Sequence, residues 1–286
     1  MLNWLTRYSF VAAELGFDAN GALTESVLDV GCGPHGLACA APAAEFVGVD
    51  VLFADRVAPG MVAFRSAPGP LPFDDAAFET VVCLDVLEHL PAGDRPGFVR
   101  ELARVASRRV LVACPSDESL WVQDVLRVAY QSRGMALPGW LNEHDEHGLP
   151  TAEEIRQACT SVAGFQAREL VMTNGLLTTL AVMADMLPEF SSRAAAEYRE
   201  NREEWLQVFT DARFGVCNRK GYAIERELAQ SPKVDASDLR DSVWSAVRCP
   251  ACGGSRLQRR PGGAVCQNCG HAVGSDQAGA INLAVR

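Results

Sequence analysis

The stretch Val27-Leu28-Asp29-Val30-Gly31-Cys32-Gly33-Pro34-His35-Gly36 predicts a short buried strand that ends in a glycine-rich turn. Glycines at these positions let the backbone turn sharply and approach a ligand closely, because they carry no Cβ. Asp50 ends the next expected strand, 21 residues after Asp29, where a carboxylate can accept hydrogen bonds from both hydroxyls of a ribose. Strand, turn and acid together favour a nucleotide-like ligand over an ordinary βα turn with Asp50 as a helix cap.

The spacing of the glycines does not separate two kinds of ligand. Gly31, Gly33 and Gly36 also fit the G-x-G-x-x-G pattern of dinucleotide-binding folds, in which a helix N-terminus faces a pyrophosphate. The Pro34-His35 pair inside the turn and the acidic Asp29 before it fit a ligand without phosphate. Asp29 can face a cationic or amine-bearing group, which a pyrophosphate is not.

Strand and helix patterns alternate over the first half of the chain, which predicts an α/β fold with a mostly parallel sheet covered on both faces. A helix is expected over residues 95–106, and a second begins after Thr151, whose hydroxyl suits an N-cap. Seven strands are expected, at residues 27–30, 45–49, 61–65, 78–84, 109–114, 165–172 and 221–227.

Composition divides the chain into three parts. Residues 1–229 are expected to form a doubly wound, Rossmann-like domain whose helical insert spans about 176–214. The polar, turn-rich residues 230–246 predict a linker, and residues 247–286 a small separate domain. The apolar side chains of the insert are expected to be core, with a lid or a dimer face, and hence an oligomer, as the alternatives.

Four cysteines near the C-terminus form two Cys-x-x-Cys pairs, Cys249/Cys252 and Cys266/Cys269, which are separated by 13 residues. Each pair can direct two thiolates at one metal, and two such pairs complete a tetrahedral zinc site. Because four thiolates leave no open position, the ion would be structural. A unit of fewer than about forty residues needs such a site in order to fold.

The formal net charge of −10 argues against general affinity for nucleic acid phosphates. The charge is uneven, because residues 248–286 carry +4 and the remainder −14. Residues 1–15 lack the basic start and the unbroken apolar run of a secretory signal, and no stretch has the apolar length of a membrane span. A cytoplasmic protein is therefore expected.

Four ordered motifs between residues 27 and 115 resemble those of class I S-adenosylmethionine-dependent methyltransferases. The first is Val27-Leu28-Asp29-Val30-Gly31-Cys32-Gly33. The second, Leu71-Pro72-Phe73-Asp74-Asp75-Ala76-Ala77-Phe78-Glu79-Thr80-Val81-Val82, resembles the fourth-strand motif of the family, and Leu84-Asp85-Val86-Leu87-Glu88-His89-Leu90 follows it. The fourth, Glu101-Leu102-Ala103-Arg104-Val105, resembles the helix before strand five.

This resemblance implies S-adenosylmethionine as cofactor and a role for each matching residue. Asp29, Gly31, Gly33 and Gly36 would surround the amino-acid moiety. Asp50 would bind the ribose, and Leu84 and Asp85 would border the methionine end of the cofactor. Members of the family often place an acid before Leu-Pro-Phe to bind the adenine amine. Here Ser66 or a backbone group would replace it, because residues 65–70 contain no acid.

Two histidine-containing segments are candidates for the chemistry. Methyl transfer needs a general base only if the nucleophile must lose a proton. His89 is a candidate base past the fourth strand, with helix capping or packing as the alternative. The run Glu143-His144-Asp145-Glu146-His147 could supply a base or a metal site, with a solvated polar loop before the Thr151 helix as the alternative. We expect Glu143, His144 and His147 to serve the substrate site, because residues 141–150 are similar to bacterial methyltransferases near surface-glycan genes.

The C-terminal forty residues resemble the small zinc-binding activator of tRNA and translation-factor methyltransferases. This resemblance implies a fused ribbon that stabilises the catalytic domain, while its arginines Arg256, Arg259 and Arg260 offer an alternative role in gripping a phosphate-bearing substrate.

The leading hypothesis is methyl transfer to a small molecule or glycan precursor, at oxygen. The alternatives are an RNA or protein methyltransferase that uses the ribbon, and a non-catalytic S-adenosylmethionine-binding module.

Overall fold

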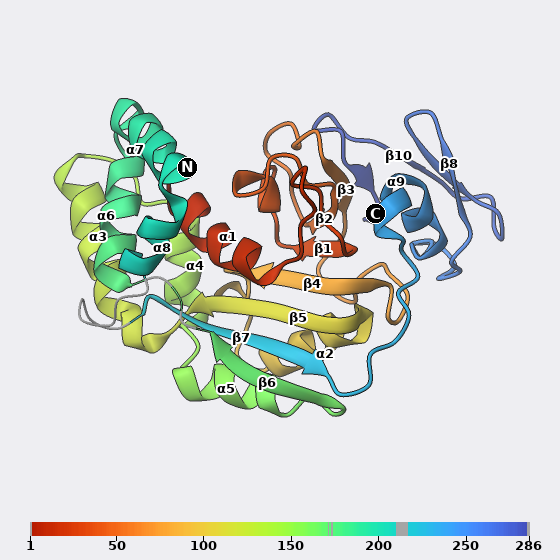
Figure 1. Ribbon diagram of the computed structural model, residues 1–286, viewed down its shortest axis with the longest axis horizontal. Coiled ribbons are helices and arrows are strands. Elements are labelled where there is room, and N and C mark those ends of the chain that lie inside the picture. The colour runs from red at the N-terminus through yellow and green to blue at the C-terminus, as the bar shows by residue number, and fades with distance from the viewer. Residues whose placement is uncertain (1, 171, 173, 210–216, 285–286) are drawn as a thin grey trace.

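The computed structural model describes residues 2–170, 172, 174–209 and 217–284 (Figure 1). Its centre is one sheet with the strand order β11-β3-β2-β1-β4-β5-β7-β6. The strands are β1 (Val27–Val30), β2 (Phe46–Asp50), β3 (Met61–Arg65), β4 (Phe78–Leu84), β5 (Ala106–Pro115), β6 (Phe165–Leu170), β7 (Arg219–Arg226) and β11 (Ile281–Asn282). The order β3-β2-β1-β4-β5 is that of dinucleotide-binding folds, and only β7 is antiparallel to its neighbours. The expected doubly wound sheet is confirmed.

The eighth strand was not expected. β11 lies in the C-terminal tail and pairs in parallel with β3, where Ile281 is in register with Phe64. It contains two residues, too few for an alternating pattern that the sequence could reveal. β5 also begins earlier than predicted, because Ala106 pairs with Phe78 directly after the preceding helix ends.

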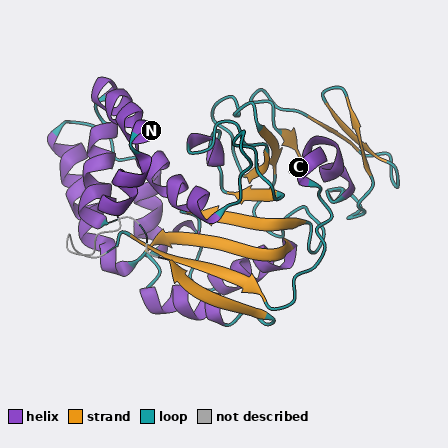
Figure 2. Ribbon diagram, in the orientation of Figure 1, coloured by secondary structure: helices purple, strands orange, loops and turns teal. Residues whose placement is uncertain are grey.

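Helices cover both faces of the sheet and its carboxyl edge (Figure 2). The helices α2 and α5 share one core with β4 and β5, whereas α1 packs against the opposite face. Within the described residues, no helix has both the length and the apolar character to cross a membrane. The helices are α1 (Leu2–Glu14), α2 (Arg95–Val105), α3 (Leu120–Ser132), α4 (Gly139–His147), α5 (Ala152–Thr160), α6 (Gly175–Asp185), α7 (Pro188–Glu200), α8 (Arg202–Phe209) and α9 (Leu239–Ser242).

Two helix predictions can be compared directly with the structure. Thr151 caps α5 as expected, since its hydroxyl accepts a hydrogen bond from the Glu154 N–H at 3.1 Å and the Glu154 carboxylate accepts one from the Thr151 N–H at 2.7 Å. The helical insert consists of α6, α7 and α8, and its predicted last residues, 210–214, lie outside the described part of the chain.

The apolar side chains of the insert are divided between core and surface. Trp205 packs with Leu5, Tyr198 and Phe209 in a cluster that joins the insert to α1. Other apolar side chains of α6 and α7 are more than two-fifths exposed, including Leu176, Leu180 and Phe190. The lid and the dimer face both remain predictions.

The C-terminal tail folds as a small three-stranded antiparallel sheet on the β3 side of the molecule (Figure 1). Its strands are β8 (Leu257–Arg260), β9 (Gly263–Cys266) and β10 (Ala272–Gly274). The domain boundaries at 229 and 247 stay a prediction, but residues 230–246 pack closely on the sheet. Val243 is fully buried, and the ring of Trp244 lies 5.5 Å from that of Phe64. Tail and sheet therefore share one hydrophobic core.

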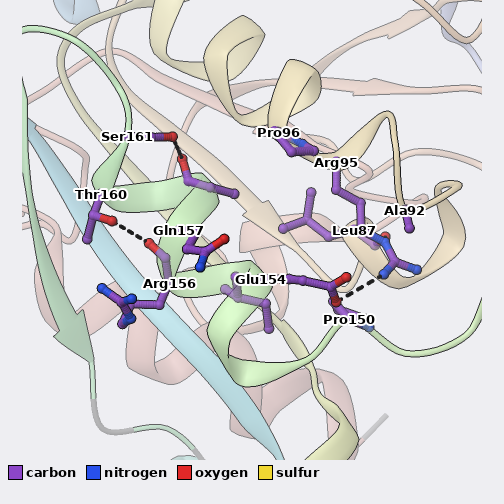
Figure 3. A pocket seen from close by; sticks show the side chains of 12 residues that line it. Leu87, Ala92, Arg95, Pro96, Pro150, Glu154, Arg156, Gln157, Thr160 and Ser161 are labelled. Carbon is purple, nitrogen blue, oxygen red and sulfur yellow. Dashed lines mark hydrogen bonds and ion pairs between the residues drawn. The ribbon is translucent and has the colours of Figure 1, made fainter.

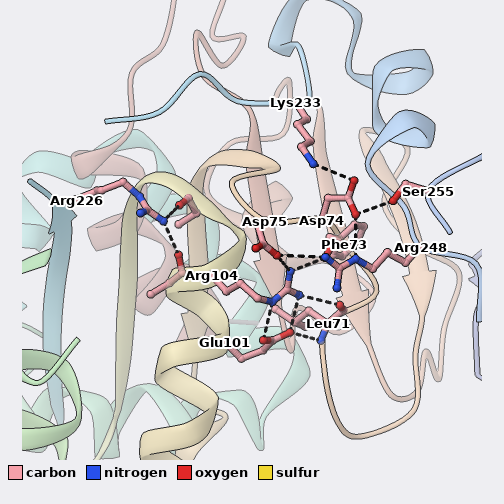
Figure 4. A network of polar contacts seen from close by, with 12 residues as sticks. Leu71, Phe73, Asp74, Asp75, Glu101, Arg104, Arg226, Lys233, Arg248 and Ser255 are labelled. Atoms are coloured by element: carbon pink, nitrogen blue, oxygen red, sulfur yellow. Dashed lines mark hydrogen bonds and ion pairs between the residues drawn. The ribbon is translucent and has the colours of Figure 1, made fainter. Parts of the chain in front are cut away.

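Asp74 of the Leu-Pro-Phe segment joins the tail to the sheet (Figure 4). Its carboxylate accepts hydrogen bonds from Arg248 Nε at 2.9 Å, Ser255 Oγ at 2.6 Å and Lys233 Nζ at 3.0 Å. Partial burial alone would raise the pKa of Asp74, but the hydrogen bonds from Ser255, Arg248 and Lys233 lower it to about 2. Asp74 is thus an ionised anchor for the C-terminal tail.

Replacement of Asp74 tests this anchor. We expect Asp74→Ala to lower the free energy of unfolding by about 2 kcal/mol, because it leaves three donors of a partly buried network without their common acceptor. The matched control is Asp75→Ala. The side chain of Asp75 also contacts Arg104 and Arg248, but it is 69% exposed. This control should cost less than about 1 kcal/mol. Urea unfolding of both variants measures the difference, and equal losses would refute the anchor.

Candidate active site

Two adjoining cavities lie where β1, β2 and β4 end. The larger cavity, about 770 Å³, follows the ends of β1 and β2 and the segment 66–71. The smaller cavity, about 330 Å³, is enclosed by residues of α1, α3, α4 and α6. Both fall in the size range of small-molecule sites. The two cavities share four residues: Gly31, Asp50, Asp85 and His89.

The glycine turn after β1 requires its glycines. Gly31 and Gly33 have φ angles of +72° and +56°, which residues other than glycine rarely adopt. A Cβ on Gly31 would lie 2.2 Å from Val86 Cγ2, and one on Gly33 would lie 2.7 Å from the Trp4 ring. Both residues line the smaller cavity, so the backbone approaches this space as the sequence predicted.

Asp29 lines neither cavity, whereas the sequence predicted a place for it beside the amino-acid moiety of the ligand. Its side chain is fully buried and accepts hydrogen bonds from the Leu37 N–H at 2.9 Å and the Tyr8 hydroxyl at 3.2 Å. Gly36 also lies behind the turn, where a Cβ would be 2.5 Å from Asp29 Oδ2. The residue ends up inside because β1 is buried over its full length. Asp29 therefore stabilises the glycine turn from the buried side, through its hydrogen bond with the Leu37 N–H.

Asp50 and Ser66 lie at the larger cavity, as expected. The Asp50 carboxylate accepts a hydrogen bond from the Gly33 N–H at 2.8 Å, so that it fixes the glycine turn and still borders both cavities. The Ser66 N–H donates to the Asp50 carbonyl at 3.0 Å. Leu84, at the end of β4, lines the smaller cavity.

Asp85 is held between two arginines. Arg219 Nε and Nη2 donate to its carboxylate at 2.6 and 2.7 Å, and Arg7 Nη1 donates to the same group. Although burial alone would raise the pKa of Asp85, Arg219 and Arg7 hold it well below its usual range. Asp85 also has a φ of +54°, a conformation that needs surrounding contacts to persist. This ion-paired group connects α1, β4 and β7.

Glu88, His89 and His144 lie together at the smaller cavity. Glu88 and His89 belong to the 3₁₀ helix η2 (Leu87–His89), and His144 to α4. Glu88 Oε1 is 3.9 Å from His89 Nε2 and 4.0 Å from His144 Nε2. Burial, reinforced by the charge of Asp85, raises the pKa of Glu88 well above its usual value. Burial is the main cause that lowers the pKa of His144 to about 4, and the neighbouring His89 lowers it further by charge repulsion.

The predicted run 143–147 forms the second half of α4 rather than a loop. Only some of its side chains reach the cavities, because a helix directs neighbouring residues to different sides. His144 lines the smaller cavity and Glu143 the larger one, where Glu143 Oε2 is 2.7 Å from His89 Nδ1. His147 lines neither cavity, so the expectation that it serves the substrate site is not met.

Sequence reasoning missed the residues that α1 and β7 contribute. Asn3, Trp4 and Arg7 come from α1, and Arg219 from the first position of β7. The apolar spacing of Leu5, Tyr8, Val11, Ala12 and Leu15 was a signal for α1. Nothing in the sequence placed this helix over the glycine turn, because that contact depends on the tertiary fold.

The four tail cysteines lie close together, as predicted. Their ligand atoms are all within 4.8 Å of one another. Cys249 Sγ is 3.8 Å from Cys269 Sγ, and Cys252 Sγ is 3.7 Å from Cys266 Sγ. Four sulfurs at 2.3 Å from a tetrahedral zinc ion would be about 3.8 Å apart. The thiolate geometry therefore fits a zinc ion.

Comparison with known proteins identifies the enzyme class. Residues 28–114 match the family described as methyltransferase domain. This matched part contains the glycine turn, Asp50, Asp85 and Glu88, which border the cavities. The chain is a S-adenosylmethionine-dependent methyltransferase. No curated protein shows significant sequence similarity to it.

Solved structures with a similar arrangement include several methyltransferases. A protein assigned as sarcosine dimethylglycine methyltransferase from Galdieria sulphuraria has 15% identity and a TM-score of 0.44, over 72% of this chain and 79% of the other. A cyclopropane synthase from Mycobacterium tuberculosis has 17% identity and a TM-score of 0.42, over 78% and 82%. The magnesium protoporphyrin IX methyltransferase of Synechocystis PCC 6803, with bound S-adenosylhomocysteine, has 19% identity and a TM-score of 0.40, over 77% and 81%.

The burial of Asp29 leads to a prediction about pH. Burial raises the pKa of its carboxyl to about 7, against the opposing hydrogen bonds from Leu37 and Tyr8. The unfolded chain therefore loses this proton at lower pH than the folded chain, and ionisation costs stability as the pH rises from about 4 to 7. The variant Asp29→Asn avoids that cost. Relative to the wild type, its free energy of unfolding should increase by about 2 kcal/mol between pH 5 and pH 8.

Urea unfolding at the two pH values measures this change. Asp124→Asn, at a side chain that is 77% exposed, is the control and should shift stability equally at both. The same difference at pH 5 and pH 8 for Asp29→Asn would contradict the raised pKa.

Proposed function

We propose that this methyltransferase acts on a hydroxyl oxygen of a small molecule or glycan precursor bound in the smaller cavity. The observation that carries the proposal is that residues of four helices line this cavity beside the residues shared with the larger one. A volume of about 330 Å³ suits one sugar-sized group. Trp4 and Trp140 offer aromatic surfaces, while Asn3, Gln123 and Asn218 offer hydrogen bonds to a hydroxylated ligand.

The larger cavity fits the cofactor. Gly31 borders this cavity without a side chain, and Asp50 presents a carboxylate where the ribose would lie. When bound, S-adenosylmethionine supplies a methyl group on a positively charged sulfur. Its methionine end would lie beside Asp85, which both cavities share, and reach Leu84 of the smaller cavity. Ser66 and the backbone of 66–71 would border the adenine. Glu101 holds this segment, since its carboxylate accepts a hydrogen bond from the Leu71 N–H at 2.7 Å.

The acceptor would be positioned mainly by the helices that close the smaller cavity. Gln123 and His144 face this cavity from α3 and α4, and Arg7 and Arg219 border it beside Asp85. In-line transfer requires the acceptor oxygen, the methyl carbon and the sulfur to be aligned. His89, shared by both cavities, is the side chain placed to contact an acceptor hydroxyl. Glu143 would orient His89 through the contact at Nδ1.

The C-terminal ribbon lies apart from the two cavities at the carboxyl edge. Arg259 Nη1 pairs with Asp241 at 3.0 Å, and Arg260 Nη2 donates to Gln258 at 2.7 Å. Both arginines line a separate cavity against β3. No described residue of the ribbon lines either cavity at the carboxyl edge. We therefore assign the ribbon a stabilising role.

Calorimetry with S-adenosylmethionine and S-adenosylhomocysteine tests the cofactor site. Asp50→Ala should weaken binding of both more than about tenfold, because it removes the ribose acceptor and the bond that fixes Gly33. Asp55→Ala, at an exposed position after β2, should bind like the wild type. Absence of binding by the wild type would refute the function, and unchanged affinity in Asp50→Ala would refute the ribose assignment.

Transfer of labelled methyl groups from S-adenosylmethionine to the small-molecule fraction of a cell extract is expected, and labelling confined to its RNA or protein would refute the acceptor class.

We further propose that Cys249, Cys252, Cys266 and Cys269 hold one structural zinc ion. Metal analysis should find about one zinc per chain. The double variant Cys252→Ser/Cys269→Ser should lose the metal and unfold at lower temperature, because the ribbon shares the core of the sheet. The control Cys39→Ser/Cys217→Ser should retain the zinc. Retention of zinc by the first variant would overturn the four-thiolate site.

A further inference from the structure

A second cluster of metal-ligating atoms lies apart from the cysteines, at the smaller cavity. Glu88, His89 and His144 each offer one ligand atom, and the three atoms lie within 4.8 Å of one another. Ligands placed 2.1 Å from one tetrahedral ion are about 3.4 Å apart. Side-chain shifts of about an ångström would therefore bring all three atoms to a common ion.

Two of these side chains are buried with unsatisfied polar atoms. Glu88 is 1% exposed and His144 is 6% exposed. Among the described residues, Glu88 Oε2 and His144 Nε2 have no hydrogen-bond partner. Buried polar groups are almost always satisfied, so these atoms indicate a missing partner. A cation bound here would satisfy a carboxylate oxygen and the imidazole nitrogens together.

The other nitrogen of each histidine has a neighbour that can orient the ring. His89 Nδ1 is 2.7 Å from the Glu143 carboxylate, an ion-pair distance without hydrogen-bond geometry. The negative charge of Glu143 favours a proton on Nδ1, which leaves the lone pair on Nε2. His144 Nδ1 is 3.0 Å from Gln123 Nε2. The Gln123 amide, turned by half a rotation, presents its oxygen to a proton on Nδ1 and leaves the lone pair on Nε2. Such outer partners are typical of metal-binding histidines.

Arg95 joins the two elements that carry the cluster, and on its outer side it lies close to Glu154 (Figure 3). It is 5% exposed, and its Nε donates to the carbonyls of Leu87 and Leu90, at 3.0 and 3.1 Å, on either side of His89. Its Nη2 donates to the carbonyl of His147 at 3.2 Å and to that of Gly148, at the end of α4. One buried guanidinium thus connects η2 with α4, which is a rigid support for ligands from both.

We propose that Glu88, His89 and His144 bind a divalent first-row transition-metal ion that orients the acceptor hydroxyl. Two imidazoles and one carboxylate suit such ions, and three protein ligands leave positions open for a substrate. The nearby guanidiniums of Arg7 and Arg219 are paired with Asp85, so neither of them forms an ion pair with Glu88. The acceptor role rests on the proposed function, whereas the metal site does not depend on it.

The ion would assist the transfer as a Lewis acid. The acceptor hydroxyl coordinates to it, and the lowered pKa of the hydroxyl releases its proton to bulk water. The oxygen then forms a bond to the methyl carbon while the carbon–sulfur bond breaks. The electron pair of that bond stays on sulfur, and S-adenosylhomocysteine and the methyl ether are the products.

Titration of the zinc-loaded full-length protein with Co²⁺ tests the site. Co²⁺ bound by nitrogen and oxygen shows weak visible bands, whereas Co²⁺ bound by thiolates adds intense charge-transfer absorption. We expect one Co²⁺ per chain with the first spectrum alone. Glu88→Gln and His144→Ala should each weaken this binding more than about tenfold, and Glu143→Gln less. The α4 variants Asp145→Asn and His147→Ala, outside the cluster, should bind Co²⁺ like the wild type.

Absence of the nitrogen–oxygen spectrum in the wild type would overturn the proposal, as would equal binding in every variant. Binding of S-adenosylhomocysteine by Glu88→Gln, measured by calorimetry, verifies that this variant is folded. Co²⁺ binding without any methyl transfer would refute the proposed function and keep the metal site. Methyl transfer that is unaffected by chelators, with no Co²⁺ bound, would refute the metal site and keep the proposed function.

Discussion

The pairing of Asp85 with Arg7 and Arg219 is the interaction on which the rest of the site depends. The three side chains come from the end of β4, from α1 and from the start of β7. A buried carboxylate flanked by two guanidiniums is stable only while both partners stay in place. This requirement fixes α1 over the glycine turn, where Trp4 excludes any side chain at Gly33. It also sustains the left-handed backbone of Asp85, and η2, with Glu88 and His89, begins two residues later.

The two ends of the molecule have separate tasks. At the carboxyl edge, α1, α3, α4 and α6 line the smaller cavity, where we place the acceptor. On the β3 side, the cysteine-bearing tail extends the sheet through β11 and shares its core through Val243 and Trp244. Asp74 belongs to the methyltransferase motif and yet anchors the tail. A zinc ion bound there would stabilise the catalytic domain through this contact and through the shared core.

The sequence predicted what depends on local pattern. The bounds of β1, β3 and β4 were correct, because each is a short apolar run bounded by turn residues. The cysteine pairs were recognised because a Cys-x-x-Cys turn brings its own ligands together. The pairing of β11 with β3 and the position of α1 depend on contacts between residues far apart in the sequence. Asp29 was assigned to the ligand for a similar reason, since its burial depends on Tyr8 and on the whole sheet.

The two histidine segments show most clearly that the sequence alone does not reveal which distant side chains come together. His89 and the run 143–147 each had an ordinary structural explanation, and neither segment alone contains a complete set of ligands. Folding joins Glu88 and His89 to His144 and directs His147 elsewhere. The resulting set differs from the four thiolates in two respects that determine chemistry. Its ligands are nitrogen and oxygen, and it has only three of them beside a cavity. A closed thiolate site can only stabilise a fold, whereas an open site of this kind can bind a substrate oxygen.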